Sequence, residues 1–457
     1  MKDKGKRVHF VGIGGAGMCP LAEVMHSRGY AVTGSDQEKS HASERLESLG
    51  IKVQYNHVPG LVRDCDTLVY SSAINLANNE LVHARKQGIT VMKRADMLGN
   101  IMKESFSIGI AGTHGKTTTT SLIGNIFQDA GKKPTVIVGG AYRESRSNAI
   151  IGNGKFLITE ADEYDRSFLK MFPAMAVVTN IERDHLDVYE DLNDIKNSFT
   201  EYVKRVPAGG TVVLCKDDRS ASQLDTNADR TVVTYGTSKA ADYQAENINF
   251  EKGTTHFDVI KNREALGSID LPLTGLHNVR NALAAIAVSC EMNVPFEVIK
   301  TSLSSFTGIQ RRFEVIGTEK EITVIDDYAH HPTEIRATLA AAMNVGFKRL
   351  VAVFQPHLYS RTRDFLNEFA ESLMRADVAV VLEIYRAREE PLNGIKSADI
   401  IEKMWGKDHA NVHYVNTVDE LPKLLVPLLK PGDGVILMGA GDIWKAGEHI
   451  LNEIKNG

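Results

Sequence analysis

The sequence predicts an α/β protein of three domains, each built on a mostly parallel sheet. Apolar runs of strand length alternate with helix-forming segments along the whole chain, and this alternation is typical of parallel sheets covered by helices. Glycine-rich turns follow two of the predicted strands. The length of 457 residues is that of two or three domains rather than one.

The first domain is predicted to span 1–103 and to be Rossmann-like, since strands and helices alternate in it. Its predicted strands and helices are 8–13, 18–29, 30–34, 42–49 and 67–70. The connection 97–105 is the expected boundary to the next domain.

A glycine-rich turn, Gly12 to Gly17, follows the first strand, and Asp36 closes the next one. Such a turn brings backbone N–H groups close to a diphosphate, and the acid can hold a ribose hydroxyl. Alone, the motif favours a nicotinamide dinucleotide, although a UDP-sugar satisfies the same chemistry. Two serines follow a strand and either contact the ligand or cap a helix. The candidate binding residues are Gly14, Gly15, Ala16, Gly17, Asp36, Ser71 and Ser72.

The central domain, 104–313, is predicted to be of the P-loop ATPase type, with a mostly parallel sheet and an antiparallel patch. Alternating polar and apolar residues over 243–260, around Lys252-Gly253, indicate a hairpin, and a helix is predicted at 278–291. The predicted parallel strands are 107–111, 135–138, 156–159, 176–179, 211–214 and 231–235.

A second glycine-rich loop lies between the strand 107–111 and a predicted helix at 119–130. Its glycines allow backbone N–H groups to point at phosphate oxygens. Lys116 adds a charge for the outer phosphates, and the Thr117 hydroxyl can reach Mg²⁺. Glu160, at the carboxyl end of a later strand, suits a cation that is already bound to phosphates. The alternative is a plain turn with a solvated lysine. The loop is Gly112-Thr113-His114-Gly115-Lys116-Thr117-Thr118.

The third domain, 314–457, is predicted to be a second Rossmann-like α/β unit. Helix-forming segments separate its strands, as in a doubly wound sheet. The predicted strands are 322–325, 350–354, 378–382 and 434–438.

Composition narrows the possible partners. The net charge of −5 provides no broad basic field for nucleic acid or an anionic membrane. The four cysteines are scattered without a CxxC pair, which indicates reduced thiols. The basic start precedes an apolar run, but four glycines interrupt that run, unlike a signal peptide. We therefore expect a cytoplasmic protein that acts on small molecules, with no nucleic-acid, membrane or obligate protein partner.

Across its full length the chain resembles the Mur ligase family. The general phosphate-loop pattern has a glycine where Ile110 stands, and the family lacks that glycine too. Nine stretches in the same order carry the resemblance: HFVGIGGAGM (9–18), GSD (34–36), GTHGKTT (112–118), EADE (160–163), NIERDH (180–185), GLHN (275–278), RRF (311–313), DDYAHHP (326–332) and FQPH (354–357).

The resemblance implies an ATP-dependent amide synthesis that requires Mg²⁺. The carboxylate of UDP-N-acetylmuramate would become an acyl phosphate, from which the amine of L-alanine displaces phosphate. Within the family, the alternative is a ligase that recycles a tripeptide onto the same sugar nucleotide. Outside it, the alternatives are an NAD-dependent dehydrogenase and a non-catalytic nucleotide switch.

The resemblance also implies catalytic and metal-binding roles. Lys116 would neutralise the γ-phosphate, and Thr117 with Glu160 would bind one Mg²⁺. His185, with Glu160 or Glu163, would bind a second Mg²⁺, although a histidine in this position can be structural. Arg361 would clamp the carboxylate of alanine, because a guanidinium grips carboxylates with two hydrogen bonds.

Further residues would bind the nucleotide and the amino acid. Asn278 would face adenine, although it can also cap a helix. Leu358 stands where the family often has arginine, so anion binding must rely on Arg361 or on another base such as Arg363. Selectivity among L-alanine, glycine and L-serine stays open. The other assignments are Arg312 to ATP, Asp327 to its ribose, and Tyr328, His330 and His357 to the amino-acid pocket.

Overall fold

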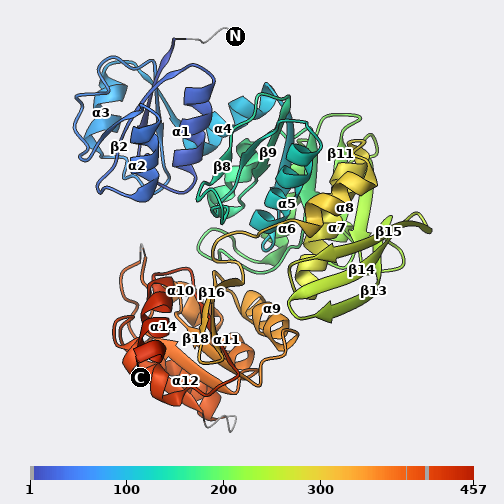
Figure 1. The fold of residues 1–457 in the computed structure, drawn as a ribbon. Helices are drawn as coiled ribbons and strands as arrows, with labels where there is room; N and C mark the ends of the chain where they lie inside the picture. Colours follow the sequence, from blue (N-terminus) through green and yellow to red (C-terminus); the bar gives the residue numbers. More distant parts are fainter. Residues whose placement is uncertain (1–4, 388, 407–410, 457) are drawn as a thin grey trace.

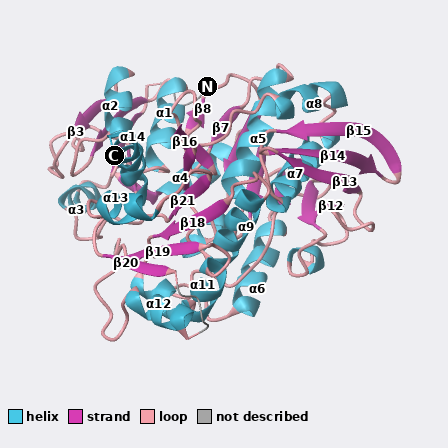
Figure 2. Cartoon of the chain, turned by 60° about the horizontal axis from the view of Figure 1, so that its bottom comes forward, coloured by secondary structure: helices cyan, strands magenta, loops and turns pink. Residues whose placement is uncertain are grey.

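The computed structural model describes residues 5–387, 389–406 and 411–456. These residues form three sheets, of five, ten and six strands. Each sheet is covered by its own helices, and the three bodies follow one another along the chain from blue through green to red (Figure 1). Helices flank most of the strands, whereas the strands within 243–271 extend to one side of the molecule (Figure 2). The predicted α/β fold with three parts is therefore observed.

The first sheet is entirely parallel, in the order β3-β2-β1-β4-β5. The elements alternate as predicted, but the short edge strands β3 and β5 were not predicted. Their bounds are β1 (Arg7–Val11), α1 (Met18–Ser27), β2 (Ala31–Ser35), α2 (His41–Ser48), β3 (Lys52–Gln54), β4 (Thr67–Tyr70), α3 (Asn79–Lys86), β5 (Thr90–Lys93) and α4 (Arg94–Lys103).

The central sheet has the order β15-β14-β13-β12-β11-β10-β6-β9-β7-β8. Its middle strands are parallel, and β13, β14 and β15 form the antiparallel patch. The elements are β6 (Phe106–Ala111), α5 (Lys116–Asp129), β7 (Thr135–Ile137), β8 (Ala149–Ile150), β9 (Phe156–Glu160), η1 (Tyr164–Lys170), β10 (Met175–Val178), α6 (Leu192–Val203), β11 (Thr211–Cys215), β12 (Thr231–Gly236), β13 (Tyr243–Glu251), β14 (Thr254–Lys261), β15 (Glu264–Leu271), α7 (Leu276–Glu291) and α8 (Phe296–Ser304).

The hairpin between β13 and β14 turns at Lys252 and Gly253, as predicted. Both residues have positive φ, 47° and 88°, which is the geometry of a two-residue turn that suits the twist of the strands. Helix α5 differs from its prediction, because it begins at Lys116 and not at residue 119. The run of threonines favours helix only weakly, and the glycine loop that ends at Gly115, the N-cap residue with φ of 83°, fixes where α5 begins.

The third sheet has the order β16-β17-β21-β18-β19-β20, parallel except for the edge strand β16. Strands β16 and β20 were not predicted. The elements are β16 (Glu314–Glu319), β17 (Ile322–Asp327), α9 (Pro332–Met343), β18 (Arg349–Phe354), α10 (Tyr359–Asp364), α11 (Leu366–Leu373), β19 (Val378–Leu382), α12 (Ala398–Trp405), β20 (Val412–Val415), α13 (Leu421–Leu425), β21 (Asp433–Met438) and α14 (Ala446–Asn456).

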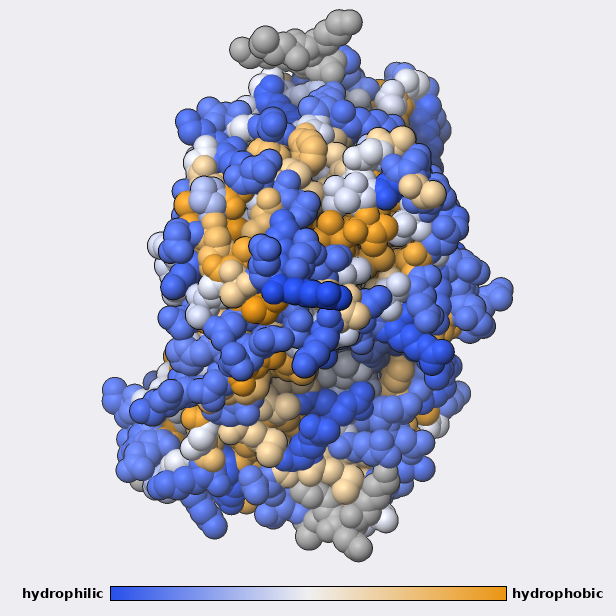
Figure 3. All heavy atoms as spheres, turned by 90° about the vertical axis from the view of Figure 1, so that its right-hand side faces the viewer, coloured by the Kyte–Doolittle hydropathy of each residue, from blue (hydrophilic) through white to orange (hydrophobic). Residues whose placement is uncertain are grey.

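Burial follows from the parallel topology. Strands covered on both faces are continuously apolar, as in β19, whose five residues are all buried, because helices exclude water from both sides. The face seen in Figure 3 is mainly hydrophilic, with apolar side chains in separate patches. Within the described ranges, no helix combines the length and apolar character needed to cross a bilayer.

Candidate active site

The loop between β6 and α5 has a backbone that only glycine fits at two positions. Gly112 and Gly115 have φ of 138° and 83°. A Cβ atom at Gly112 would lie 2.0 Å from Thr179 Oγ1, and one at Gly115 would lie 2.4 Å from Asn281 Oδ1. The loop can therefore fold tightly against β10 and α7, which brings its backbone to the start of α5.

The N–H groups of this loop divide into two sets. Those of Thr113 and His114 donate to the backbone and side-chain oxygens of Asn180, at 3.0 and 2.8 Å. This differs from the expectation that the whole loop points at phosphate. The first turn of α5 starts at Lys116 and has N–H groups without intrahelical acceptors. An anion is therefore favoured at the start of the helix, where the helix dipole adds to the attraction.

The Lys116 ammonium lies against an acidic strand end. Its Nζ is 2.8 and 3.0 Å from the two carboxylate oxygens of Glu163, and 2.6 Å from the carbonyl oxygen of Gly112. Burial opposes the charge on Lys116, but the neighbouring carboxylates Glu163 and Asp162 raise its pKa above the ordinary value. The lysine is therefore held as a cation at the mouth of the loop.

A possible metal-binding cluster lies beside this lysine. One ligand atom each of Asp162, Glu163 and His185 falls within 4.8 Å of the others, and His185 Nε2 is 3.8 Å from Glu163 Oε1. Glu160 lies apart from that group in its contacts, since Oε1 accepts from the Gly139 N–H at 2.5 Å. The structure thus brings Glu163 and His185 together as predicted, and it adds Asp162.

His185 has a left-handed backbone, with φ of 52°. This conformation is uncommon for a residue with a side chain and is found where other contacts hold it. The carboxylate of Asp184 supplies such a contact, since Oδ1 accepts from the His185 N–H at 2.7 Å. The turn points the imidazole back toward Glu163.

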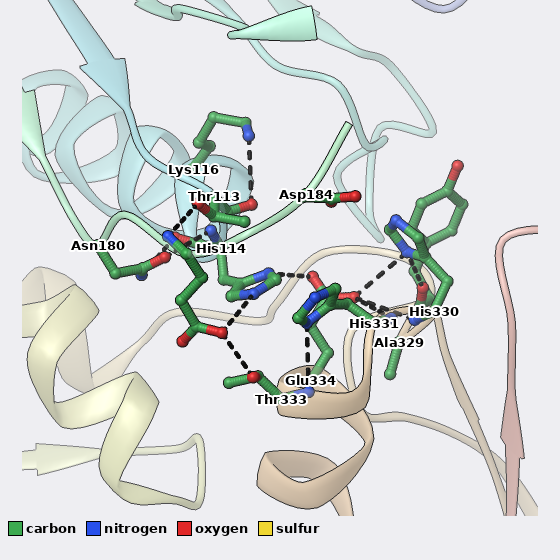
Figure 4. A network of polar contacts seen from close by, with 12 residues as sticks. Thr113, His114, Lys116, Asn180, Asp184, Ala329, His330, His331, Thr333 and Glu334 are labelled. Atoms are coloured by element: carbon green, nitrogen blue, oxygen red, sulfur yellow. Dashed lines mark hydrogen bonds and ion pairs between the residues drawn. The ribbon is translucent and has the colours of Figure 1, made fainter. Parts of the chain in front are cut away.

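The phosphate loop also contacts the third sheet through its histidine. His114 Nδ1 is 3.0 Å from Glu334 Oε1 on α9, and Nε2 is 3.7 Å from Glu182 Oε2. Thr333 donates to the same Glu182 carboxylate at 2.6 Å. His114 and Glu334 point toward one another from the loop and from α9 (Figure 4), and Glu182 joins them from a third segment. Burial opposes the charge on His114, but Glu334 and Glu182 raise its pKa to about 9.

The residues predicted for the amino-acid pocket lie together at the carboxyl ends of β17 and β18. The His330 ring centroid is 5.3 Å from that of Tyr328 and 6.1 Å from that of His357. Arg361 is buried, and its Nη2 donates to Asp184 Oδ1 at 2.8 Å. Burial, with the nearby Arg361 charge, lowers the pKa of His330 to about 4, so this imidazole is neutral near pH 7.

Asp184 is correspondingly an ionised carboxylate. Burial alone would favour its neutral form, but Arg361 and the neighbouring His185 hold its pKa well below the ordinary value. The ion pair of Arg361 and Asp184 is buried, with side chains 7% and 8% exposed, and is not a surface salt bridge.

A cavity of about 570 Å³ lies between the phosphate loop and the third sheet, a size that suits a nucleotide. The predicted residues Asn278, Arg312 and Asp327 line it, together with His277. Asn278 does not cap α7, because its Nδ2 donates to the Thr274 carbonyl at 2.9 Å. Burial and nearby arginines lower the pKa of His277 to about 4, so this imidazole is neutral near pH 7.

Asp327 is anchored at the end of β17. Its carboxylate accepts from the N–H groups of Phe313 and Ala329, both at 2.8 Å. Arg311 donates to Asp326 at 3.0 Å and to two carbonyl oxygens after β21. The guanidinium of Arg312 lies over the Tyr328 ring, 5.3 Å from its centroid. Arg312 is thus placed where the second and third sheets meet.

The glycine-rich turn of the first sheet folds against the end of β2. The N–H groups of Gly12 and Ile13 donate to the Ser35 carbonyl at 2.8 and 3.0 Å. Asp36 Oδ2 accepts from the Gly14 N–H at 2.7 Å, so the carboxylate predicted for a ribose shapes the turn. Gly15 and Ala16 are exposed at its tip, and Gly17 lies against Arg94.

The two serines after β4 lie near the same turn. A Cβ atom on Gly12 would be 3.5 Å from the Cβ of Ser71, and Ser72 is exposed. Neither serine caps α3, whose N-cap is Asn78. The alternative of a helix cap is therefore wrong, and the hydroxyls remain candidates for a ligand.

Comparisons with known proteins agree with this geometry. Three family descriptions match the chain in order: "Mur ligase family, catalytic domain" over 7–106, "Mur ligase middle domain" over 110–289, and "Mur ligase, glutamate ligase domain" over 311–441. The UDP-N-acetylmuramate–L-alanine ligase of Salinibacter ruber is 49% identical over 99% of this chain and 95% of its own. That of Syntrophotalea carbinolica is 43% identical over 98% of both chains.

The chain belongs to the Mur ligase family.

Two kinds of ligase are found among the solved structures that match this chain. The UDP-N-acetylmuramate–alanine ligase of Thermotoga maritima matches with a TM-score of 0.83 and 29% identity, covering 98% of this chain and 99% of that one. A murein peptide ligase of Psychrobacter arcticus matches with a TM-score of 0.72 and 25% identity, covering 99% of both. The family and the three-part fold expected from the sequence are confirmed, and the dehydrogenase alternative is not favoured.

Several residues of this Mur ligase site were not assigned from the sequence. Asp162, Glu182 and Asp184 lie inside two of the resembling stretches, but only their neighbours received roles. Leu358 is buried and has φ of 72°, so its side chain points away from solvent and offers no charge. Arg363 is exposed, and its Nε donates to its neighbour Asp364 at 2.7 Å.

Proposed function

We propose that this Mur ligase joins L-alanine to the lactyl carboxylate of UDP-N-acetylmuramate, with conversion of ATP to ADP and phosphate. The observation that carries the proposal is the meeting of two anion-binding centres. Lys116 and the start of α5 lie beside the cluster of Glu163 and His185. Arg361, the proposed clamp for the amino acid, is bound to the residue next to His185.

The proposed reaction has two steps, formation of an acyl phosphate and its attack by the amine. A carboxylate oxygen of the sugar nucleotide attacks the γ-phosphorus, and the bond to the bridging oxygen breaks, which releases ADP. The alanine amine then attacks the acyl carbon, loses a proton, and expels phosphate. A carboxylate is a poor acyl donor, so the phosphate is needed as a leaving group. Lys116 neutralises charge on the transferred phosphoryl group.

The donor set fits a divalent cation. Asp162, Glu163 and His185 offer two carboxylates and an imidazole that are close enough to share one ion, and oxygen ligands suit Mg²⁺. We assign Glu163 and His185 to one Mg²⁺, and Thr117 with Glu160 to another. The ions would neutralise phosphate charge and orient the reacting oxygens.

Each part of the chain would hold one substrate. We propose that 1–103 binds the sugar nucleotide through the turn at Gly14 and the Asp36 carboxylate. The segment 104–313 would bind ATP, with adenosine in the cavity beside Asn278. The segment 314–457 would bind L-alanine through Tyr328, His330, His357 and Arg361. The four cysteines, all within the described ranges, are free thiols, which supports a place for the reaction in the reducing cytoplasm.

The test is phosphate release from ATP in the presence of UDP-N-acetylmuramate and Mg²⁺, scanned over amino acids. We expect release with L-alanine and less with glycine or L-serine. A preference for L-Ala-γ-D-Glu-diaminopimelate would indicate the recycling ligase instead. Nucleotide binding without phosphate release, with both substrates present, would indicate a switch.

A further inference from the structure

Three consecutive residues that follow β10 contact α9, α10 and the loop before α9 in the third part of the chain. They immediately precede His185, so the third part of the chain is attached directly beside the proposed metal centre. Each contact uses a different residue of the third segment. The pairs are Thr333 with the Glu182 carboxylate at 2.6 Å, His331 with the Arg183 carbonyl at 3.1 Å, and Arg361 with the Asp184 carboxylate at 2.8 Å.

The pair of Asp184 and Arg361 differs from the other two in burial and charge. Its side chains are 8% and 7% exposed, whereas that of Glu182 is 34% exposed. Two charges leave water at a high cost unless their geometry is well satisfied. Arg361 Nη1 also faces His357 Nδ1 at 3.4 Å. These two contacts, one from the second part of the chain and one from the third, fix the plane of the guanidinium.

The same carboxylate holds His185. Asp184 Oδ1 accepts both from Arg361 and from the His185 N–H, and Oδ2 is 3.8 Å from His185 Nε2. A guanidinium has five N–H donors, so the bond to Asp184 leaves donors for a second carboxylate. One side chain therefore sets the separation between the proposed amino-acid clamp and the proposed metal histidine.

We propose that Asp184 is a positioning residue that holds Arg361 in the orientation that receives the carboxylate of the amino-acid substrate. This inference rests on the proposed function, because it requires Arg361 to bind that carboxylate. Without the Asp184 charge, the guanidinium remains buried and turns toward other acceptors. The amino acid then binds more weakly, and its amine is displaced from the acyl phosphate, because alignment within a fraction of an ångström governs such reactions.

The test compares Asp184→Asn with a matched control, Asp433→Asn. Asp433 is also a buried partner of an arginine, since it contacts Arg349 at 2.7 and 3.0 Å, but it lies at the amino end of β21, away from the site. We expect Asp184→Asn to raise the KM for L-alanine by about tenfold, the loss of one oriented charged hydrogen bond. The amide oxygen of this variant can still accept from the His185 N–H, so the KM values for ATP and for UDP-N-acetylmuramate should change little. Asp433→Asn should leave the KM for L-alanine unchanged, although it lowers the Tm.

A second measurement does not depend on turnover. Calorimetry gives the Kd of L-alanine for the complex with UDP-N-acetylmuramate and a non-hydrolysable ATP analogue, and this Kd should rise in Asp184→Asn. If that variant does not fold, Asp184→Glu retains the ion pair but moves the charge by one methylene, and it should also weaken L-alanine binding. An L-alanine KM and Kd equal to wild type, with only a lower Tm, would show that the pair is structural and overturn the proposal.

The proposal and the proposed function fail in distinguishable ways. The function fails if the wild-type protein releases no phosphate with L-alanine and UDP-N-acetylmuramate. The positioning role fails if the wild-type protein binds L-alanine and the Asp184→Asn variant binds it equally well.

Discussion

Lys116 is predicted to stabilise the protein as well as to act on phosphate. The pair with Glu163 is buried, with side chains 14% and 4% exposed, and Asp162 adds a second negative charge nearby. Removal of one partner from a buried ion pair costs roughly 3–5 kcal/mol, because the other charge stays buried without compensation. For a domain of this size, about 3 kcal/mol lowers the Tm by on the order of 6–12 °C.

The perturbation is Lys116→Met, which retains the length of the side chain and removes its charge. We expect a lower Tm and no phosphate release, with UDP-N-acetylmuramate still bound by the first sheet. In the double variant with Glu163→Gln, both groups are neutral and the Tm should recover most of the loss. Phosphate release should remain absent, because the cation is still missing.

Scanning calorimetry measures the Tm, and a coupled phosphate assay measures turnover. Burial raises the pKa of Glu163, and without Lys116 this rise should be larger. The stability deficit of Lys116→Met should therefore shrink as the pH falls and Glu163 takes up a proton. A Lys116→Met variant as stable as wild type at neutral pH, or one that turns over ATP, would refute the reasoning.

Three further predictions concern other parts of the site. Asp36→Ala should raise the KM for the sugar nucleotide and leave that for ATP nearly unchanged, because Asp36 holds the turn at Gly14. Gly115→Ala should raise the KM for ATP and lower the stability by more than the backbone cost of about 1–2 kcal/mol for a left-handed residue, since its Cβ would meet Asn281. Gly131→Ala, with φ of 69° and open space around it, is the control that measures the backbone cost alone. The His114 pKa is raised to about 9 by Glu334 and Glu182 against the cost of burial, so its contribution of up to about 3 kcal/mol is complete below pH 6.5 and lost as the pH rises through 9. Urea unfolding at several pH values should show this alkaline slope in wild type and a flatter one in His114→Gln.

Elements with strong local signals could be predicted from the sequence. Strands such as β10 and β19 are short apolar runs, and burial on both faces makes them so. Edge strands such as β3, with three residues, and β16, with no buried residue, lack that signal. Such strands form because a neighbouring strand in the folded sheet offers hydrogen bonds, and this contact leaves no pattern in their own sequence.

The candidate site shows the same limit. Lys116 and Glu163 lie in motifs with a local chemical meaning, so they could be assigned before their contacts were known. The contact between Asp184 and Arg361 joins residues 177 apart in the chain. It depends on how the second and third sheets dock, and no local pattern encodes that. The contact of Glu160 with the Gly139 N–H shows the same limit, because the strand end that carries Glu160 was predicted while Gly139 lies in a loop with no local signal.

The arrangement of charges links the proposed binding of ATP to that of metal. The Lys116 ammonium has three N–H donors and contacts the Gly112 carbonyl and both carboxylate oxygens of Glu163 in this structure, so it must release at least one of these acceptors to bind a phosphoryl oxygen. When the ammonium turns toward the nucleotide, Glu163 is left buried beside Asp162. The two negative charges then repel each other strongly, because little water screens them. A divalent cation held by these carboxylates and His185 replaces the lost charge. Nucleotide and metal should therefore each strengthen the binding of the other, and by reciprocity by the same factor.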